Sequence, residues 1–81
     1  MIANIFIIGL GLIGGSLGLA IRGTPQVRTV NGFDIDPHTM QQALQMGAID
    51  AGVELAAGAA QADVIIICAP LRFYAGIIEE I

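Results

Sequence analysis

The stretch Ile5–Leu19, IFIIGLGLIGGSLGL, decides the fold of this chain. A run of β-forming residues leads directly into Gly9, Gly11 and Gly14, and an apolar segment compatible with a helix follows. Glycines spaced G-x-G-x-x-G between a strand and a helix have separate roles. The first permits a tight turn, the second lets the backbone approach a pyrophosphate, and the third lets the helix lie close to the sheet. The helix start, at Leu12–Gly14, would present free N–H groups and the positive end of the helix dipole to the phosphates.

A glycine-rich turn by itself is also compatible with a plain connection from strand to helix, so the surrounding sequence has to decide. A nucleotide-binding turn opens a βαβ unit, with an acidic residue about 20 positions further on that binds the ribose hydroxyls. Residues Val27–Phe33, VRTVNGF, predict the second strand, and Asp34 follows at its carboxyl end, twenty positions after Gly14. This spacing predicts a dinucleotide site with Asp34 at the ribose.

The composition limits the classes of partner. The chain has 81 residues, of which 56% are hydrophobic and 12% charged, and its mean hydropathy is +0.81. Such an apolar chain of this size is expected to be part of a larger domain that covers its faces. The net charge of −4, with three arginines, provides no basic stripe, so we expect no nucleic-acid partner. One cysteine and one histidine can form neither an internal disulfide nor a metal cluster, and they suit a reducing cytoplasm.

A membrane-spanning segment is the main alternative for the first part of the chain, because Ile2–Ile21 is long and apolar. The glycines within Gly9–Gly18 would weaken such a helix. The start of the chain, Met1–Asn4, lacks the basic region of a signal peptide. The second apolar run, Val64–Ala69, is too short to span a bilayer but suits a buried parallel strand. We therefore expect no membrane partner.

The alternation of strand and helix signals predicts an α/β chain, a partial Rossmann fold with a mostly parallel sheet and helices on both faces. Asp36 is predicted to cap a helix that begins with Pro37, and Arg22 to complement the dipole of the helix that it ends. If the crossover is right-handed, Ala69–Leu71 should emerge beside the glycine turn. The expected strands are Ile2–Ile8, Val27–Phe33 and Asp63–Pro70, with Ala48–Asp50 as a short strand or a turn; the expected helices are Leu12–Arg22, His38–Met46, Ala51–Ala60 and Leu71–Ile81.

Three further side chains could carry chemistry. His38 is expected to lie exposed in the first turn of a helix, away from the cleft, so it is not a candidate catalytic base. Cys68 in a buried strand is expected to pack as a small hydrophobic residue. Asp63 stands at the amino end of its strand, where no function is expected.

These segments together resemble the amino-terminal nucleotide-binding domain of the prephenate dehydrogenase family, which includes arogenate and cyclohexadienyl dehydrogenases. Gly-Gly-Ser at Gly14–Ser16 is the more specific part. Related β-hydroxyacid dehydrogenases share the glycine pattern but usually have methionine where this chain has Ile13. The resemblance is carried by GLGLIGGSLGLAIR (Gly9–Arg22), VNGFDIDP (Val30–Pro37), MGAID (Met46–Asp50) and DVIIICAP (Asp63–Pro70).

The resemblance implies an NAD-dependent oxidative decarboxylation of prephenate to 4-hydroxyphenylpyruvate, in tyrosine biosynthesis. The family's catalytic histidine, and the helical carboxyl-terminal domain that supplies substrate contacts and the homodimer interface, are expected outside residues 1–81. His38 does not match that histidine, so no catalytic residue and no metal ligand is assigned here. Ile35 after Asp34 favours NAD over NADP, because a carboxylate repels a 2′-phosphate. The family's cofactor role falls on Gly9, Gly11, Leu12, Ile13, Gly14 and Asp34, with Ala69 and Pro70 as cleft wall.

Alternatives remain open at this point. The chain could be the NAD-binding part of another dehydrogenase or of an imine reductase on the same fold. It could also be a non-catalytic nucleotide-sensing module. The sequence does not distinguish prephenate from arogenate as substrate.

Overall fold

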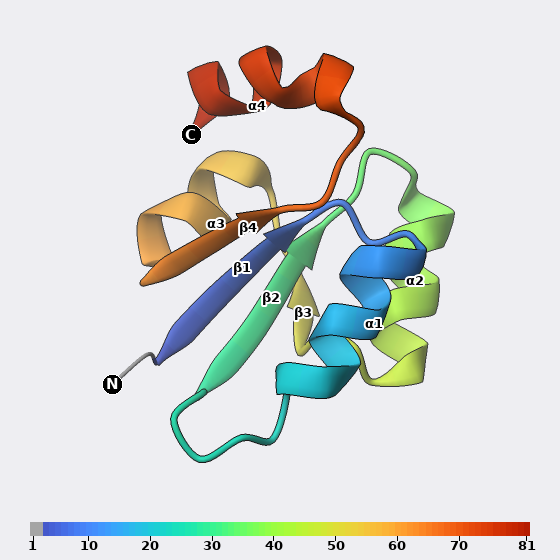
Figure 1. The fold of residues 1–81 in the computed structure, drawn as a ribbon, viewed down its shortest axis with the longest axis vertical. Coiled ribbons are helices and arrows are strands. Elements are labelled where there is room, and N and C mark those ends of the chain that lie inside the picture. Colours follow the sequence, from blue (N-terminus) through green and yellow to red (C-terminus); the bar gives the residue numbers. More distant parts are fainter. Residues whose placement is uncertain (1–2) are drawn as a thin grey trace.

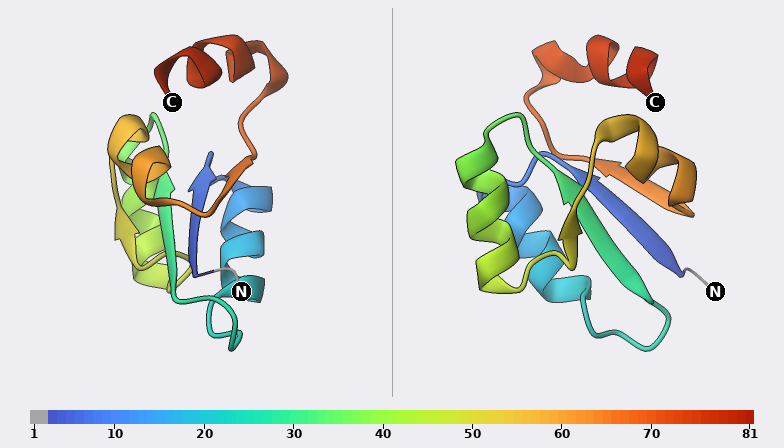
Figure 2. Two further views of the ribbon diagram at one scale, coloured as in Figure 1. Left: turned by 90° about the vertical axis from the view of Figure 1, so that its left-hand side faces the viewer. Right: turned by 180° about the vertical axis from the view of Figure 1, so that it is seen from behind.

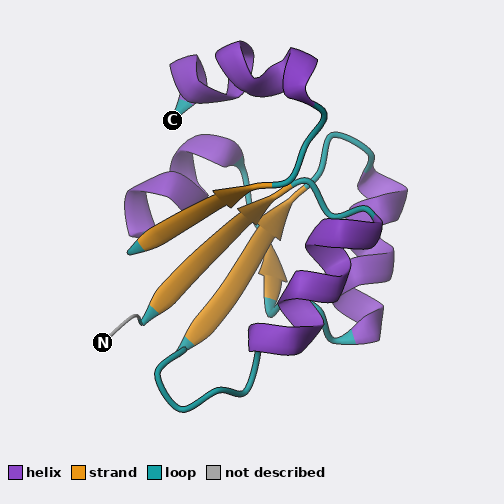
Figure 3. Cartoon of the chain, viewed as in Figure 1, coloured by secondary structure: helices purple, strands orange, loops and turns teal. Residues whose placement is uncertain are grey.

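Strands and helices alternate along the whole chain (Figure 1). The computed structural model describes residues 3–81. Its strands form one sheet in the order β3-β2-β1-β4, in which every neighbouring pair is parallel (Figure 3). The predicted α/β class and partial Rossmann fold are therefore confirmed. The elements are β1 (Asn4–Ile8), α1 (Leu12–Ile21), β2 (Thr29–Phe33), α2 (Pro37–Met46), β3 (Ala51–Gly52), α3 (Leu55–Gln61), β4 (Val64–Ile67), the 3₁₀ turn η1 (Leu71–Phe73) and α4 (Tyr74–Glu80).

Strand β1 lies between β2 and β4 and is buried on both faces. Ile7 pairs with Gly32 of β2 and with Ile66 of β4. The four residues from Ile5 to Ile8 are at most 6% exposed. A central parallel strand needs such a continuous apolar run, because helices cover both of its faces.

Alternate residues of β1 point into two separate cores. Ile5 and Ile7 pack with Val30 of β2 and with Ala43 of α2, and this core also contacts the end of α1. Phe6 and Ile8 pack with Leu55 of α3, and Ile77 of α4 is packed against the same cluster. Figure 2 shows α1 and α3 on opposite sides of the sheet, as expected for helices on both faces.

The third strand and the third helix differ from the prediction. Ala51 and Gly52 pair with Asn31 and Gly32 of β2 as strand β3, so the helix expected from Ala51 begins only at Leu55. The segment 48–50 forms bends and no strand, which fits the second of the two expected alternatives, a short strand or a turn. An alanine-rich sequence favours a helix. At Ala51 and Gly52, however, the edge of β2 offers backbone hydrogen-bond partners, and this cannot be predicted from the local sequence.

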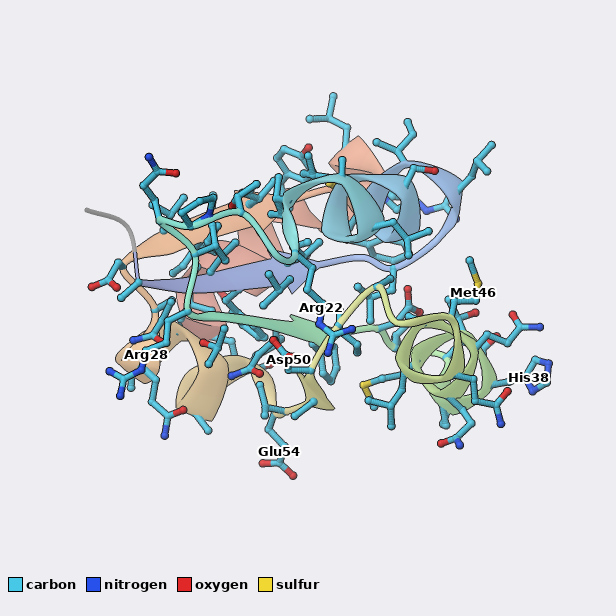
Figure 4. All side chains as sticks on the ribbon, turned by 90° about the horizontal axis from the view of Figure 1, so that it is seen from below. Arg22, Arg28, His38, Met46, Asp50 and Glu54 are labelled. Atoms are coloured by element: carbon cyan, nitrogen blue, oxygen red, sulfur yellow. The ribbon has the colours of Figure 1, made fainter. Side chains whose placement is uncertain are left out.

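Arg22 makes contacts that the sequence did not predict. It ends α1, where its backbone N–H donates to the carbonyl oxygen of Gly18 at 3.0 Å. The guanidinium pairs with Asp50 at 2.7 Å and donates to the carbonyl oxygen of Gly47, which ends α2 (Figure 4). Asp50 also accepts a hydrogen bond from the N–H of Val30 at 2.8 Å. This network therefore joins α1, α2 and β2 at the amino end of the sheet.

Strand β4 is shorter than predicted, since it covers Val64–Ile67 and not Asp63–Pro70. Asp63 lies just before it, and its carboxylate accepts hydrogen bonds from the N–H groups of Ala3 and Asn4. These bonds tie the start of β4 to the start of β1. The predicted start of β1 at Ile2 lies outside the described residues. Within residues 3–81, no helix has both the length and the apolar character needed to cross a membrane.

Candidate functional site

A cleft of about 460 Å³ lies at the carboxyl ends of β1, β2 and β4 and is also lined by residues of α4. Figure 1 shows α4 lying beyond these strand ends. Open parallel sheets bind ligands at this edge. Five predicted site residues line the cleft: Gly9, Gly11, Asp34, Ala69 and Pro70.

Gly9 brings the ends of β1 and β4 together. Its backbone φ is +95°, a value that residues with a Cβ rarely adopt. A Cβ at this position would lie 2.7 Å from the backbone nitrogen of Ala69 and 2.8 Å from the carbonyl carbon of Cys68. The sharp turn and the close approach both require glycine, and they place Ala69 beside the glycine turn as predicted.

Gly14 lets α1 start directly against this turn. A Cβ there would overlap the carbonyl oxygen of Gly9 and lie 3.0 Å from its carbonyl carbon. The N–H of Gly15 donates to the oxygen of Gly11, the N-cap, at 2.8 Å. The amides before Gly15 belong to the first turn of the helix, where N–H groups have no partner within the helix. A Cβ at Gly11 would meet nothing within 4 Å, so the space next to Gly11 at the start of the helix is open.

The structure does not place every predicted residue on the cleft surface. Leu12 and Ile13 lie at the start of α1 with side chains that are 88% and 74% exposed, and Gly14 is buried under the turn. None of these three residues is among those that line the cleft.

Asp34 is fixed at the end of β2 by two backbone groups. One carboxylate oxygen accepts from the N–H of Leu10 at 2.8 Å, and the other accepts from the N–H of Asp36 at 2.9 Å. Each oxygen of an ionised carboxylate can accept two hydrogen bonds, so each keeps one acceptor position. One acceptor position on each oxygen is thus left for hydrogen-bond donors from outside the chain. Its bond to the glycine turn through Leu10 was not predicted.

Asp36 has the structural role that the sequence predicted. Its side chain accepts from the N–H of His38 at 2.9 Å, and Pro37 occupies the first helical position. His38 is exposed and points outward from α2 (Figure 4), which confirms that expectation. Cys68 packs against the core as the small hydrophobic residue that was expected, but it lies one position after β4, is half-buried and also lines the cleft.

The sequence analysis did not predict that the last segment of the chain lines the cleft with apolar side chains and with the acidic Glu80. Tyr74 donates a hydrogen bond from its hydroxyl to the carbonyl oxygen of Ile67 at 3.2 Å, which ties α4 to the end of β4. The spacing of apolar residues in the last eleven positions was a usable signal for this face. The missed lining residues with large or charged side chains are Ile8, Phe33, Ile35, Leu55, Phe73, Ile77 and Glu80.

Among the described residues, no group of three or more His, Cys, Asp or Glu side chains could hold a metal ion. The arrangement instead offers backbone N–H groups at a helix start, one oriented carboxylate and an apolar slot. Such a set suits a ligand with phosphate, ribose and a flat base.

Comparison with known proteins identifies the family. A model of the prephenate dehydrogenase nucleotide-binding domain matches residues 17–81. The chain belongs to this family. It is 38% identical over 78 residues to the prephenate dehydrogenase of Lactococcus lactis, a match that covers 96% of this chain and 22% of the relative.

Two solved structures of prephenate and arogenate dehydrogenases have the same architecture. The prephenate dehydrogenase from A. aeolicus, in complex with hydroxyphenyl propionate and NAD⁺, superimposes with a TM-score of 0.86 at 27% identity, over 99% of this chain and 29% of that one. The Synechocystis arogenate dehydrogenase gives a TM-score of 0.80 at 28% identity, over 95% of this chain and 27% of that one. The chain thus spans less than a third of each of these relatives.

Proposed function

We propose that this chain binds NAD as the nucleotide-binding part of a prephenate dehydrogenase. The observation that carries the proposal is the convergence of the glycine turn, the start of α1 and the Asp34 carboxylate at one cleft. Membership of the family supports it. NAD, when bound, would supply the hydride acceptor of the reaction.

The phosphates would lie against the start of α1. Leu12, Ile13 and Gly14 provide backbone N–H groups there, and the open space in front of Gly11 leaves room for a pyrophosphate. The positive end of the helix dipole adds attraction for the anion. Attraction from the helix end matters here because the chain is acidic, with a net charge of −4.

Asp34 would hold the ribose of the adenosine half through its two remaining acceptor positions. The same carboxylate would repel the 2′-phosphate of NADP, and Ile35 beside it provides no positive charge to offset this repulsion. We therefore propose a strong preference for NAD. Ala69 and Pro70 would form the cleft wall next to the turn.

No side chain within this chain is proposed as catalytic. The substrate, prephenate or arogenate, would be bound by residues outside positions 1–81, and a homodimer would form through the same outside region. We propose a cytoplasmic location. It follows that the 81-residue chain alone would not produce NADH from NAD and prephenate, and prephenate-dependent NADH formation by it would contradict this assignment.

Calorimetric titration of NAD and NADP into the 81-residue chain tests the proposal. Saturable NAD binding, with NADP much weaker, is expected. Asp34→Ala should weaken NAD binding about a hundredfold or more, because hydrogen bonds from both ribose hydroxyls to a charged group are lost, roughly 1.5 kcal/mol or more for each. Glu79→Gln, which removes one negative charge on the exposed side of α4, is the matched control and should keep the wild-type affinity. A chain whose circular dichroism shows it folded but which does not bind NAD would refute the proposal.

A further inference from the structure

The wall of the cleft that α4 forms combines apolar residues with an acidic one. Phe73, Gly76, Ile77 and Glu80 line the cleft. Their spacing of three, four and seven residues places them on one side of a helix. Glu80 contributes the one charged side chain that this wall has among the described residues, whereas the neighbouring Glu79 lies outside the lining.

The rest of the cleft around Glu80 is suited to a flat ring. Ile35 and Leu55 line it from the side of β2 and α3, and Phe73 and Ile77 line it from the side of α4. Ile35 is 81% exposed and Phe73 is 41% exposed, so large apolar surfaces are left for a ligand to cover. A mostly apolar slot with a few polar groups at its edge is typical of sites for planar ligands.

The position of Asp34 indicates which ring would occupy the slot. Asp34 precedes Ile35 in the chain and lines the same cleft. If the ribose lies at Asp34, the base attached to that ribose extends into the slot between Ile35 and α4. Glu80, one helical turn beyond Ile77, would then face the outer edge of the base.

We propose that Glu80 is a specificity-determining residue that selects adenine over hypoxanthine at this position. The inference rests on the proposed function. An ionised carboxylate only accepts hydrogen bonds. The 6-amino group of adenine is a donor, whereas hypoxanthine has a carbonyl oxygen at the same place. A carboxylate therefore gains a hydrogen bond with the first base and meets an acceptor in the second.

The test compares NAD with its hypoxanthine analogue, deamino-NAD, by calorimetric titration into the 81-residue chain. The wild type should bind NAD about tenfold more tightly, as expected for one hydrogen bond to a charged group at a partly open site. Glu80→Gln should reduce this ratio to below about threefold, because a glutamine amide can either accept from an amino group or donate to a carbonyl.

Glu79→Gln is the matched control for charge. Both variants remove one negative charge from the last turn of α4, so a general electrostatic effect would change the affinity for both nucleotides equally in both variants. Only Glu80→Gln should change the ratio, and circular dichroism should show both variants folded, since both residues are exposed.

Equal binding of NAD and deamino-NAD by the wild type would overturn the inference while leaving the proposed function in place. An unchanged ratio in Glu80→Gln, or an equal change in Glu79→Gln, would do the same. Binding of neither nucleotide by the folded wild type would refute the proposed function, and the role of Glu80 with it.

Discussion

Replacing Gly14 by alanine tests whether α1 must lie directly against the glycine turn. In an ordinary helix interior this change is stabilising, by about 1 kcal/mol, because alanine has the higher helix propensity. Here the added methyl group would overlap the carbonyl oxygen of Gly9 and lie 3.4 Å from Cγ2 of Ile7. The first obstacle is backbone, which cannot rotate away as a side chain can.

The expected loss of stability combines the cost of this overlap with the gain in helix propensity. Overpacking against a rigid neighbour costs about 1–3 kcal/mol and occasionally more, and backbone overlap places Gly14→Ala at the upper end of that range. After the gain in propensity, we expect the free energy of unfolding to fall by about 2 kcal/mol. For a chain of this size such a loss lowers Tm by about 10 °C.

Urea and thermal unfolding followed by circular dichroism would measure the effect. Gly76→Ala in α4 is the matched control, because a Cβ at Gly76 would meet nothing within 4 Å. The control should be as stable as the wild type or more stable, by up to about 1 kcal/mol. If Gly14→Ala were also as stable as the wild type, the close packing of α1 on the turn would be wrong.

Three further predictions separate binding from stability. Gly11→Ala should leave the free energy of unfolding within about 0.5 kcal/mol of the wild type, since its added Cβ has no neighbour within 4 Å. The same variant should weaken NAD binding at least tenfold, because the methyl group would fill the space proposed for the phosphates. Normal NAD affinity would show that the phosphates lie elsewhere. Alkylation of Cys68, the single cysteine, should be slower when NAD is present, because the residue lines the cleft. Mass spectrometry can measure the alkylation rate, and an unchanged rate would argue against NAD binding in the cleft. Arg22→Ala should lower the free energy of unfolding by only about 1 kcal/mol, because the ion pair with Asp50 is partly open to solvent, with side chains 41% and 33% exposed. The Kd for NAD should not change, and a changed Kd would contradict the separation of this network from the site.

Elements whose signals are local could be predicted from the sequence. The helix between Asp36 and Gly47 begins and ends as expected, because the capping aspartate, Pro37 and the left-handed glycine each act on neighbouring backbone. The strands at Asn4–Ile8 and Val64–Ile67 follow from runs of β-branched residues, but only the first is buried, because the second lies at the edge of the sheet and is half-buried. The position of Asp34 at the end of β2 follows from the chain alone.

Features that depend on contacts between residues far apart in the sequence could not be predicted. Strand β3 forms because Ala51 and Gly52 pair with the free edge of β2. The strand and helix propensities of these two residues do not predict this pairing. The bond from Leu10 to Asp34 joins residues 24 positions apart. The orientation of α4, which brings Glu80 to the cleft, depends on the hydroxyl of Tyr74 and on the packing of Ile77.

The central claim is that a nucleotide binds at the carboxyl ends of the strands, and an NMR titration tests it most directly. NAD should be added to the ¹⁵N-labelled chain while the amide signals are followed. The account predicts saturable shifts concentrated at residues 9–14, Asp34 and Ala69, with little change at Arg22 and Arg28, which line a separate pocket. Shifts centred on Arg22 and Arg28, or no shifts in the folded chain, would contradict it.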